Sequence, residues 1–132
     1  MDAQNAVRSN RACWGYSLEN DRVADLPTVY ISGDNASLSR VEEIAERLGP
    51  IDIAVLFAGA ARTALVPGEN LTLSSADAAR AVAILGNPKT LMLHFEDWAH
   101  FTEGRPELLA AIEAANLSQT LTMATRGSTV RL

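Results

Sequence analysis

Two short apolar runs, each bounded by glycine, proline or polar residues, constrain this 132-residue sequence most strongly. Residues 51–58 contain the run IAVLF, and residues 89–95 contain the run TLML. Strands that are apolar along their whole length are typical of sheets covered on both faces. The two runs therefore predict buried strands of an α/β protein, each expecting cover on both sides.

Three helices are predicted from periodicity and capping residues. The first has Ser39 and Glu42 spaced as a capping box, and it stops at Gly49-Pro50. The second is capped by Ser74 or Ser75, and the third has Pro106 in its first turn. The residues expected to face inward are Leu38, Val41, Ile44, Ala45 and Leu48, then Ala78, Ala79, Val82, Ala83 and Leu85, and finally Leu108, Leu109, Ala111, Ile112 and Ala115.

Further strands are expected over residues 12–18 and 27–32, joined by a charged hairpin loop over residues 19–25. Residues 119–124 and 128–132 are predicted to form a closing hairpin that turns at Arg126-Gly127. Strands and helices thus alternate, which predicts one α/β layered domain over residues 1–132. Residues 1–10 are expected to be a flexible or partial N-terminal segment.

Charge and composition exclude several classes of protein. A net charge of −5 argues against a nucleic-acid partner held by phosphate contacts. No window approaches the roughly eighteen continuous apolar residues of a membrane span. The polar start of the chain, without the apolar core of a signal peptide, favours a cytoplasmic location.

One stretch, residues 42–62, looks like the middle of a short-chain dehydrogenase. A dinucleotide-binding fold needs a glycine-rich turn that lets the backbone approach the pyrophosphate. The only candidate turn, Gly33-Asp34-Asn35, places a carboxylate there instead. Neither Tyr16 nor Tyr30 has a lysine four residues later, so the catalytic pair of those enzymes is absent. A Rossmann-like nucleotide binder is therefore the least favoured alternative.

Two ionisable residues stand at the ends of predicted strands. Asp34 follows VYISG, and His94 follows TLML. Strand ends of α/β sheets are where a rigid scaffold presents side chains that solvent can still reach. An isolated residue in such a place is more often a cap than a ligand, so the surrounding motifs carry the argument.

Six motifs in order resemble the C-terminal portion of the metallo-β-lactamase superfamily. The similar branch contains L-ascorbate-6-phosphate lactonases and N-acyl-phosphatidylethanolamine phospholipases. The block at residues 94–101, HFEDWAHF, is the most specific motif. The other five are Trp14-Gly15-Tyr16, Ser32-Gly33-Asp34-Asn35, Pro50-Ile51-Asp52, Gly59-Ala60 and residues 73–79.

The resemblance implies half of a four-layer αββα sandwich, a mixed sheet with helices on one face. It also implies that Asp34 and His94 are metal ligands, with zinc or manganese as the metal in the full-length family member. Asn35, Trp98 and His100 would be substrate-binding residues or would support the ligands. The reaction implied is hydrolysis of a small ester, lactone or phosphodiester by a bridging hydroxide.

The family's main metal motif, His-x-His-x-Asp-His, cannot occur here, because the chain has only two histidines. Catalytic zinc takes at least three protein ligands. We therefore expect this chain alone to be inactive, because it has no complete catalytic set, and stoichiometric metal in it would require ligands from a partner subunit. The alternative is a non-catalytic, dimeric binding or structural module. In either case an uncovered sheet face predicts self-association.

Overall fold

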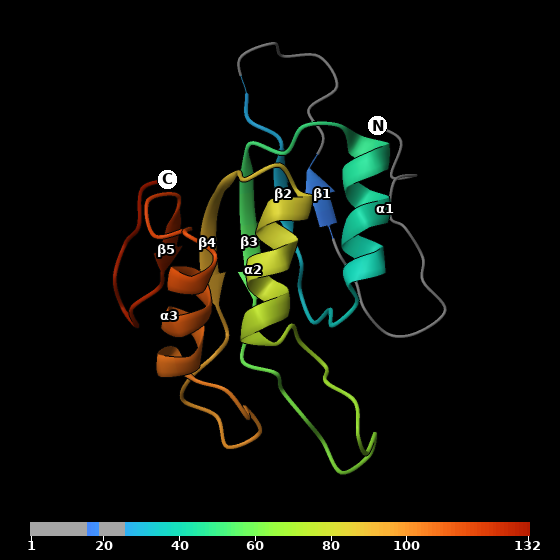
Figure 1. Cartoon of the computed structure of the whole chain (residues 1–132), viewed down its shortest axis with the longest axis vertical. Helices are drawn as coiled ribbons and strands as arrows, with labels where there is room; N and C mark the ends of the chain where they lie inside the picture. The colour runs from blue at the N-terminus through green and yellow to red at the C-terminus, as the bar shows by residue number, and fades with distance from the viewer. Residues whose placement is uncertain (1–15, 19–25) are drawn as a thin grey trace.

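The computed structural model of the chain describes residues 16–18 and 26–132. Within these residues five strands and three helices follow one another along the chain (Figure 1). The strands are β1 (Tyr16–Leu18), β2 (Val29–Ile31), β3 (Ile53–Phe57), β4 (Lys89–Leu93) and β5 (Leu121–Met123). The helices are α1 (Leu38–Leu48), α2 (Ser75–Ile84) and α3 (Arg105–Ala114).

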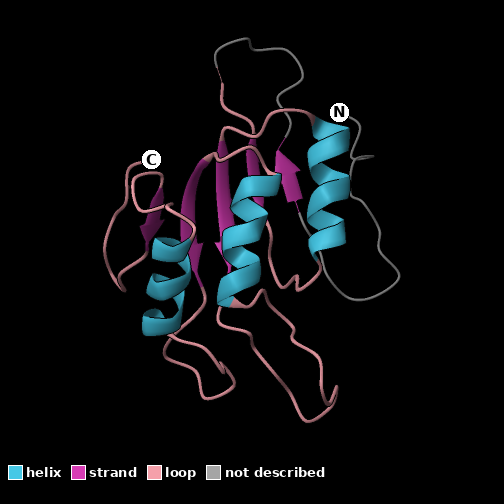
Figure 2. Cartoon of the chain, in the orientation of Figure 1, coloured by secondary structure: helices cyan, strands magenta, loops and turns pink. Residues whose placement is uncertain are grey.

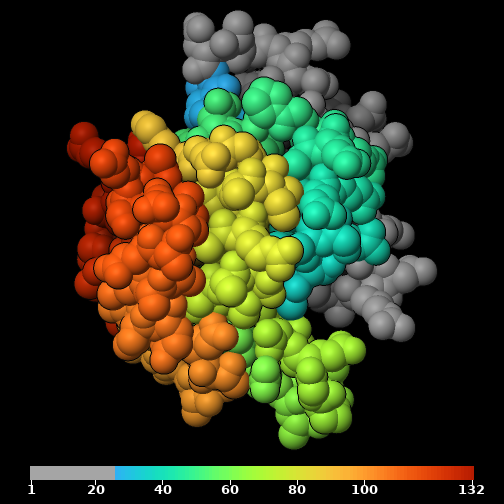
Figure 3. All heavy atoms as spheres, viewed as in Figure 1, coloured from blue at the N-terminus to red at the C-terminus, as the bar shows by residue number. Residues whose placement is uncertain are grey.

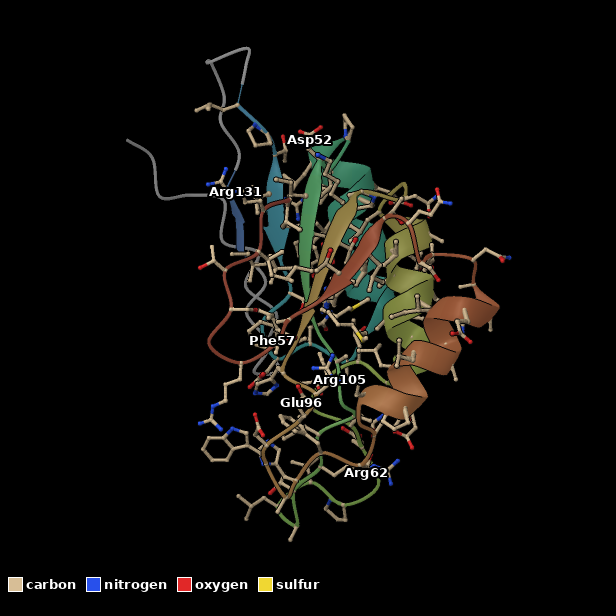
Figure 4. All side chains as sticks on the ribbon, turned by 90° about the vertical axis from the view of Figure 1, so that its left-hand side faces the viewer. Asp52, Phe57, Arg62, Glu96, Arg105 and Arg131 are labelled. Atoms are coloured by element: carbon tan, nitrogen blue, oxygen red, sulfur yellow. The ribbon has the colours of Figure 1, made fainter. Side chains whose placement is uncertain are left out.

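The described strands form one sheet in the order β1-β2-β3-β4-β5. Strands β2 to β5 are parallel, and β1 pairs antiparallel with β2. Successive parallel strands are added in one direction, and right-handed crossovers then place every connecting helix on the same side. Figure 2 and the side view in Figure 4 show the helices together on that side. The predicted mixed sheet with helices on one face is confirmed.

The core lies between the sheet and the helices. Alternate strand residues, Ala54 and Leu56 on β3 and Met92 on β4, are fully buried there. Each large apolar side chain removed from water in this way contributes about 1.5–3 kcal/mol. The helices supply the opposing residues, which are Val41, Ile44, Ala78, Ala79, Ala81, Val82, Leu108 and Ile112.

The second side of the sheet carries the other strand residues. The register aligns Ile31 with Val55 and Val55 with Leu91, so the three form a row across β2, β3 and β4. A second pair, Phe57 and Leu93, continues this apolar side toward the ends of the strands. All five side chains are only partly buried. The segment after β5 runs along this side in Figure 4 and covers part of it.

The helix predictions were right in position and wrong in detail. The N-cap of α1 is Ser37 rather than Ser39, because the side chain of Asn35 accepts a hydrogen bond from the Ser37 N–H and starts the helix earlier. Ser74, one of the two residues predicted to cap α2, does so by accepting from the Asp77 N–H at 3.1 Å. The predicted inward residues Ala83, Leu109 and Ala115 are exposed.

The predicted C-terminal hairpin is wrong. Leu121–Met123 forms β5, which pairs in parallel with β4, and residues 128–132 form no strand. The pairing with β4 is continued by the Ala124 N–H, which donates to the carbonyl of Met92 at 3.1 Å. The turn at Arg126-Gly127 is present, with a Gly127 φ of 76°. The predictions for residues 1–10, 12–15 and 19–25 lie outside the described residues.

Within the part of the chain that the structure describes, no helix has both the length and the apolar character needed to cross a membrane.

Candidate metal centre

Asp34 and His94 lie together at one edge of the sheet. Strands β2 and β4 are each parallel to β3, so their carboxyl ends reach the same edge. Asp34 follows β2 by three residues, and His94 follows β4 directly. The Nδ1 atom of His94 lies 3.9 Å from Oδ1 of Asp34, and the Asp34 side chain is 62% exposed. The two predicted ligands therefore meet where solvent can reach them.

The backbone bends sharply at both residues. Gly33, immediately before Asp34, has a φ of 55°, and His94 itself has a φ of 59°. A left-handed conformation costs a non-glycine residue about 1–2 kcal/mol and persists only where surrounding structure enforces it. At His94 that structure includes Gly59, where an added Cβ would lie 2.8 Å from the His94 carbonyl oxygen.

A buried serine joins the ends of β2 and β3. The hydroxyl of Ser32 accepts a hydrogen bond from the Phe57 N–H at 2.9 Å, while the Ser32 N–H donates to the Val55 carbonyl. Because these bonds continue past the last paired residues of β2, they fix the start of the turn that carries Asp34. This role of Ser32 was not predicted, although its place at the end of the predicted strand over residues 27–32 was visible in the sequence.

Aromatic rings surround the His94 imidazole. The Phe57 ring stacks on it at a centroid distance of 4.9 Å, and the Phe101 ring meets it edge-on at 4.8 Å. Phe57 lies at the carboxyl end of β3 (Figure 4), in register with Leu93, the neighbour of His94. The two phenylalanines restrict rotation of the imidazole, and sequence reasoning assigned neither of them a role.

Two loops extend from this edge and are tied to each other. Residues 59–73 follow β3, residues 94–104 follow β4, and an isolated antiparallel bridge joins Ala61 to Phe101. The Gly59 carbonyl accepts from the N–H groups of Thr102 and Glu103, and the Thr102 hydroxyl donates to the Ala60 carbonyl. The loops lie side by side at the lower edge in Figure 1. The bridge and these hydrogen bonds hold the two loops together beside His94.

An ion pair anchors the second loop to α3. Both Nε and Nη2 of Arg105 donate to the Glu96 carboxylate, and Nη2 also donates to the Ala124 carbonyl at 3.0 Å. The hydrogen bond with Glu96 raises the pKa of Arg105 above its usual value. Figure 4 shows the two side chains pointing toward each other below the sheet. This pair was also missed by sequence reasoning.

The three remaining predicted site residues are placed differently from one another. Asn35 is buried, and its amide is engaged with the backbone of Ser37, which directs it toward α1. The His100 ring lies 6.3 Å from the His94 ring, and the Trp98 ring lies 5.8 Å from that of His100. The structure thus brings His100 and Trp98 near His94 and turns Asn35 away from it.

One buried atom at this edge lacks a partner. Nδ1 of His94 is buried without a hydrogen bond, and its nearest acidic neighbour is the Asp34 carboxylate. A buried polar atom left unsatisfied costs about 1–3 kcal/mol. Neutral imidazole and carboxylate are both donors that zinc accepts, so the pair fits a metal ion. Among the described residues, however, no group of three or more His, Cys, Asp or Glu side chains could hold one.

Comparison with known proteins identifies relatives that depend on a metal. No family model matches the chain. A UPF0173 metal-dependent hydrolase of Pyrococcus horikoshii is 32% identical over 84 residues, which is 64% of this chain and 32% of the relative. The chain thus spans about one third of the length of this curated relative.

Solved structures share the fold. A possible metal-dependent hydrolase from Veillonella parvula superposes with a TM-score of 0.71 at 24% identity, covering 84% of this chain and 42% of the other. An isothiocyanate hydrolase from Delia radicum gut bacteria gives 0.74 at 22% identity, covering 90% and 43%. A mutant of the β-hydroxylase CmlA gives 0.57 at 14% identity, covering 85% and 26%. The fold alone therefore does not fix the reaction.

The chain has the α/β fold of part of these two hydrolases, consistent with half of a sandwich. The predicted resemblance to these proteins is confirmed over part of the chain. The narrower likeness to lactonases and phospholipases stays a prediction, as do the roles of the individual site residues.

Proposed function

We propose that this chain forms part of a metal-dependent hydrolase and contributes Asp34 and His94 as two metal ligands. The observation that carries the proposal is the buried, unpartnered Nδ1 of His94, 3.9 Å from the exposed Asp34 carboxylate. Relatives described as metal-dependent hydrolases support the class of reaction. The metal would be zinc or manganese, and the substrate a small ester, lactone or phosphodiester. We place the reaction in the cytoplasm.

The chain's own residues would hold and orient the reacting groups. Asp34, reached by solvent, can accept a second cation or a proton from an attacking water, while Phe57 and Phe101 keep the His94 ring in place. A bound divalent ion supplies Lewis acidity and lowers the pKa of water, as in other metallohydrolases. Two ligands are too few for catalytic zinc, so we propose that the remaining ligands come from outside the described residues.

Nuclear magnetic resonance of the two histidines tests the proposal directly. We expect zinc to shift the ring resonances of His94 more than those of His100, which His100→Gln assigns. Asp34→Asn should weaken zinc binding at least about tenfold, since a carboxylate ligand loses its charge. Asp77→Asn, which removes a carboxylate at the start of α2, is the matched control and should bind zinc as the unaltered chain does. Equal shifts at both histidines, or none, would contradict the proposal.

Activity is tested separately with 4-nitrophenyl acetate and bis(4-nitrophenyl) phosphate. The isolated chain should give no zinc- or manganese-dependent hydrolysis above a chelator-treated control. Metal-dependent turnover that His94→Gln abolishes would show that the chain completes its own site, and would contradict the proposed incompleteness.

A non-catalytic binding module is the competing proposal. It is favoured by the lack of any three-residue metal-binding group among residues 16–18 and 26–132. Zinc that leaves His94 unperturbed, in a folded chain, would favour it over a hydrolase. A Rossmann-like nucleotide binder stays the weakest proposal, and tight NAD(P) binding in a titration would revive it.

A further inference from the structure

Exposed apolar side chains gather on the two loops beside His94. Trp98 is 67% exposed on the loop after β4, while Leu65 and Val66 on the loop after β3 are 89% and 39% exposed. Large apolar side chains exposed near a functional site usually contact a ligand or a partner protein. The loop after β3 projects beyond the body of the molecule in Figure 3.

A run of rings connects Trp98 to the candidate metal ligand. The centroid of the Trp98 ring lies 5.8 Å from that of His100, and the His100 ring lies 6.3 Å from that of His94. Phe101 adds a ring 4.6 Å from His100. Centroid distances of about 4.5–7 Å are those of interacting aromatic pairs. The run therefore leads from solvent at Trp98 to the imidazole of His94.

The backbone holds this run in place. The carbonyl of His100 accepts from the Arg62 N–H at 2.9 Å, and Phe101 forms the bridge to Ala61. Both ring-bearing residues are thus fixed to the loop after β3, whereas the Trp98 side chain is largely exposed to solvent. A fixed row of rings with one exposed end offers a stacking surface at little cost in conformational entropy.

We propose that the substrate of this site carries an aromatic group, which stacks on Trp98 and His100 while its reacting part lies at Asp34 and His94. The inference rests on the proposed function, since the metal ligands define where the reacting part lies. Ring stacking favours an aromatic group over an aliphatic one, because the two π-systems add an attraction beyond burial of apolar area.

Two small probes separate the aromatic contact from the metal contact. Phenylphosphonate and methylphosphonate carry the same anionic group and differ in the ring. Titrations of the full chain with zinc in excess are followed by the indole N–H resonances of its two tryptophans, Trp14 and Trp98. We expect phenylphosphonate to bind roughly five- to tenfold more tightly than methylphosphonate, a ratio in the range of aromatic pair energies. The Trp98 resonance should move.

The variants are compared by the ratio of the two affinities, so that any change in anion binding cancels. Trp98→Ala should bring the ratio to about one. Trp98→Leu keeps an apolar side chain without the ring, and should lose most of the preference. Leu109→Ala removes an exposed apolar side chain on α3 and should keep the full ratio.

A ratio that Trp98→Ala leaves unchanged, or the absence of binding by either probe, would overturn the proposal. So would a Trp98 resonance that moves with protein concentration rather than with probe, because that would mark a contact between copies of the chain. Zinc titration of His94 tests the proposed function independently, so the failure of one proposal is recognised apart from the failure of the other.

Discussion

Nδ1 of His94 faces Oδ1 of Asp34 at 3.9 Å, although two helices and two strands, α1, β3, α2 and β4, separate the two residues along the chain. The contact depends on a backbone that turns sharply at His94, with a φ of 59°. Gly59 packs closely against the His94 carbonyl, and the rings of Phe57 and Phe101 pack against the His94 imidazole. Residues that are not themselves proposed ligands therefore determine where His94 points.

Substituting Gly59 tests this close packing. Gly59→Ala introduces a Cβ 2.8 Å from the His94 carbonyl oxygen and the Phe95 Cα, at a φ of 92° that side chains rarely adopt. We expect a loss of about 2–4 kcal/mol in the free energy of unfolding, measured by urea denaturation. Gly68→Ala is the control, since Gly68 has a φ of 86° and open space around it. Its loss should be about 1 kcal/mol, and equal losses would contradict the close packing.

The geometry of the Arg105 guanidinium is the subject of the second prediction. Arg105→Lys keeps the charge and loses the paired hydrogen bonds to Glu96 together with the one to Ala124. Because the pair is partly exposed, we expect a loss of only about 1 kcal/mol in unfolding free energy. Arg126→Lys, at the exposed pair with Asp97, should change stability by less than about 0.5 kcal/mol. Losses of the same size at both positions would show that the paired hydrogen bonds from the Arg105 guanidinium to Glu96 add nothing to stability beyond the charge.

The ionisation of Glu107 makes the stability of the fold depend on pH. Glu107 accepts a hydrogen bond from the Gly104 N–H at 2.9 Å, and this bond lowers the pKa of Glu107. A lowered pKa in the folded state means that the ionised carboxylate stabilises the fold above the ordinary glutamate pKa of about 4.3. That contribution is lost as the pH falls through the lowered value.

Glu107→Gln therefore should lower Tm at pH 7, and the difference from the unaltered chain should vanish at acid pH below the folded-state pKa. Glu113→Gln, exposed on the same helix, is the control and should change Tm little at either pH. A Glu107→Gln difference that stays constant across the titration would show that the charge has no part in the cap.

The second side of the sheet leads to the fourth prediction. Its row of Ile31, Val55 and Leu91 is apolar and partly exposed, so we expect the chain to self-associate through it. Val55→Glu should shift the chain toward monomer in sedimentation velocity at micromolar concentration. Ala83→Glu adds the same charge on the exposed face of α2 and should leave the association unchanged. A folded, monomeric unaltered chain would contradict the expectation.

The sequence by itself determined most of the elements and which residues are candidates for the site. Apolar runs marked β3 and β4, helical periodicity marked the helices, and glycine with proline marked the end of α1 at Gly49. These signals are local, because hydrophobic spacing and turn residues act over a few neighbouring positions. Asp34 and His94 could be named as candidates because each stands near the end of a strand that the sequence revealed and within a motif that resembles the metallo-β-lactamase superfamily.

Only the tertiary structure decided which partners those elements found. Residues 121–123 could pair with the chain that follows or with β4, and pairing with β4 also places Leu121 and Met123 against the core. The left-handed conformation of His94 depends on Gly59, which lies far from it in sequence. Long-range pairing and close packing carry no local periodic signal. Asp34 and His94 were therefore readable in the sequence as candidate ligands, whereas their meeting at 3.9 Å was decided by the fold.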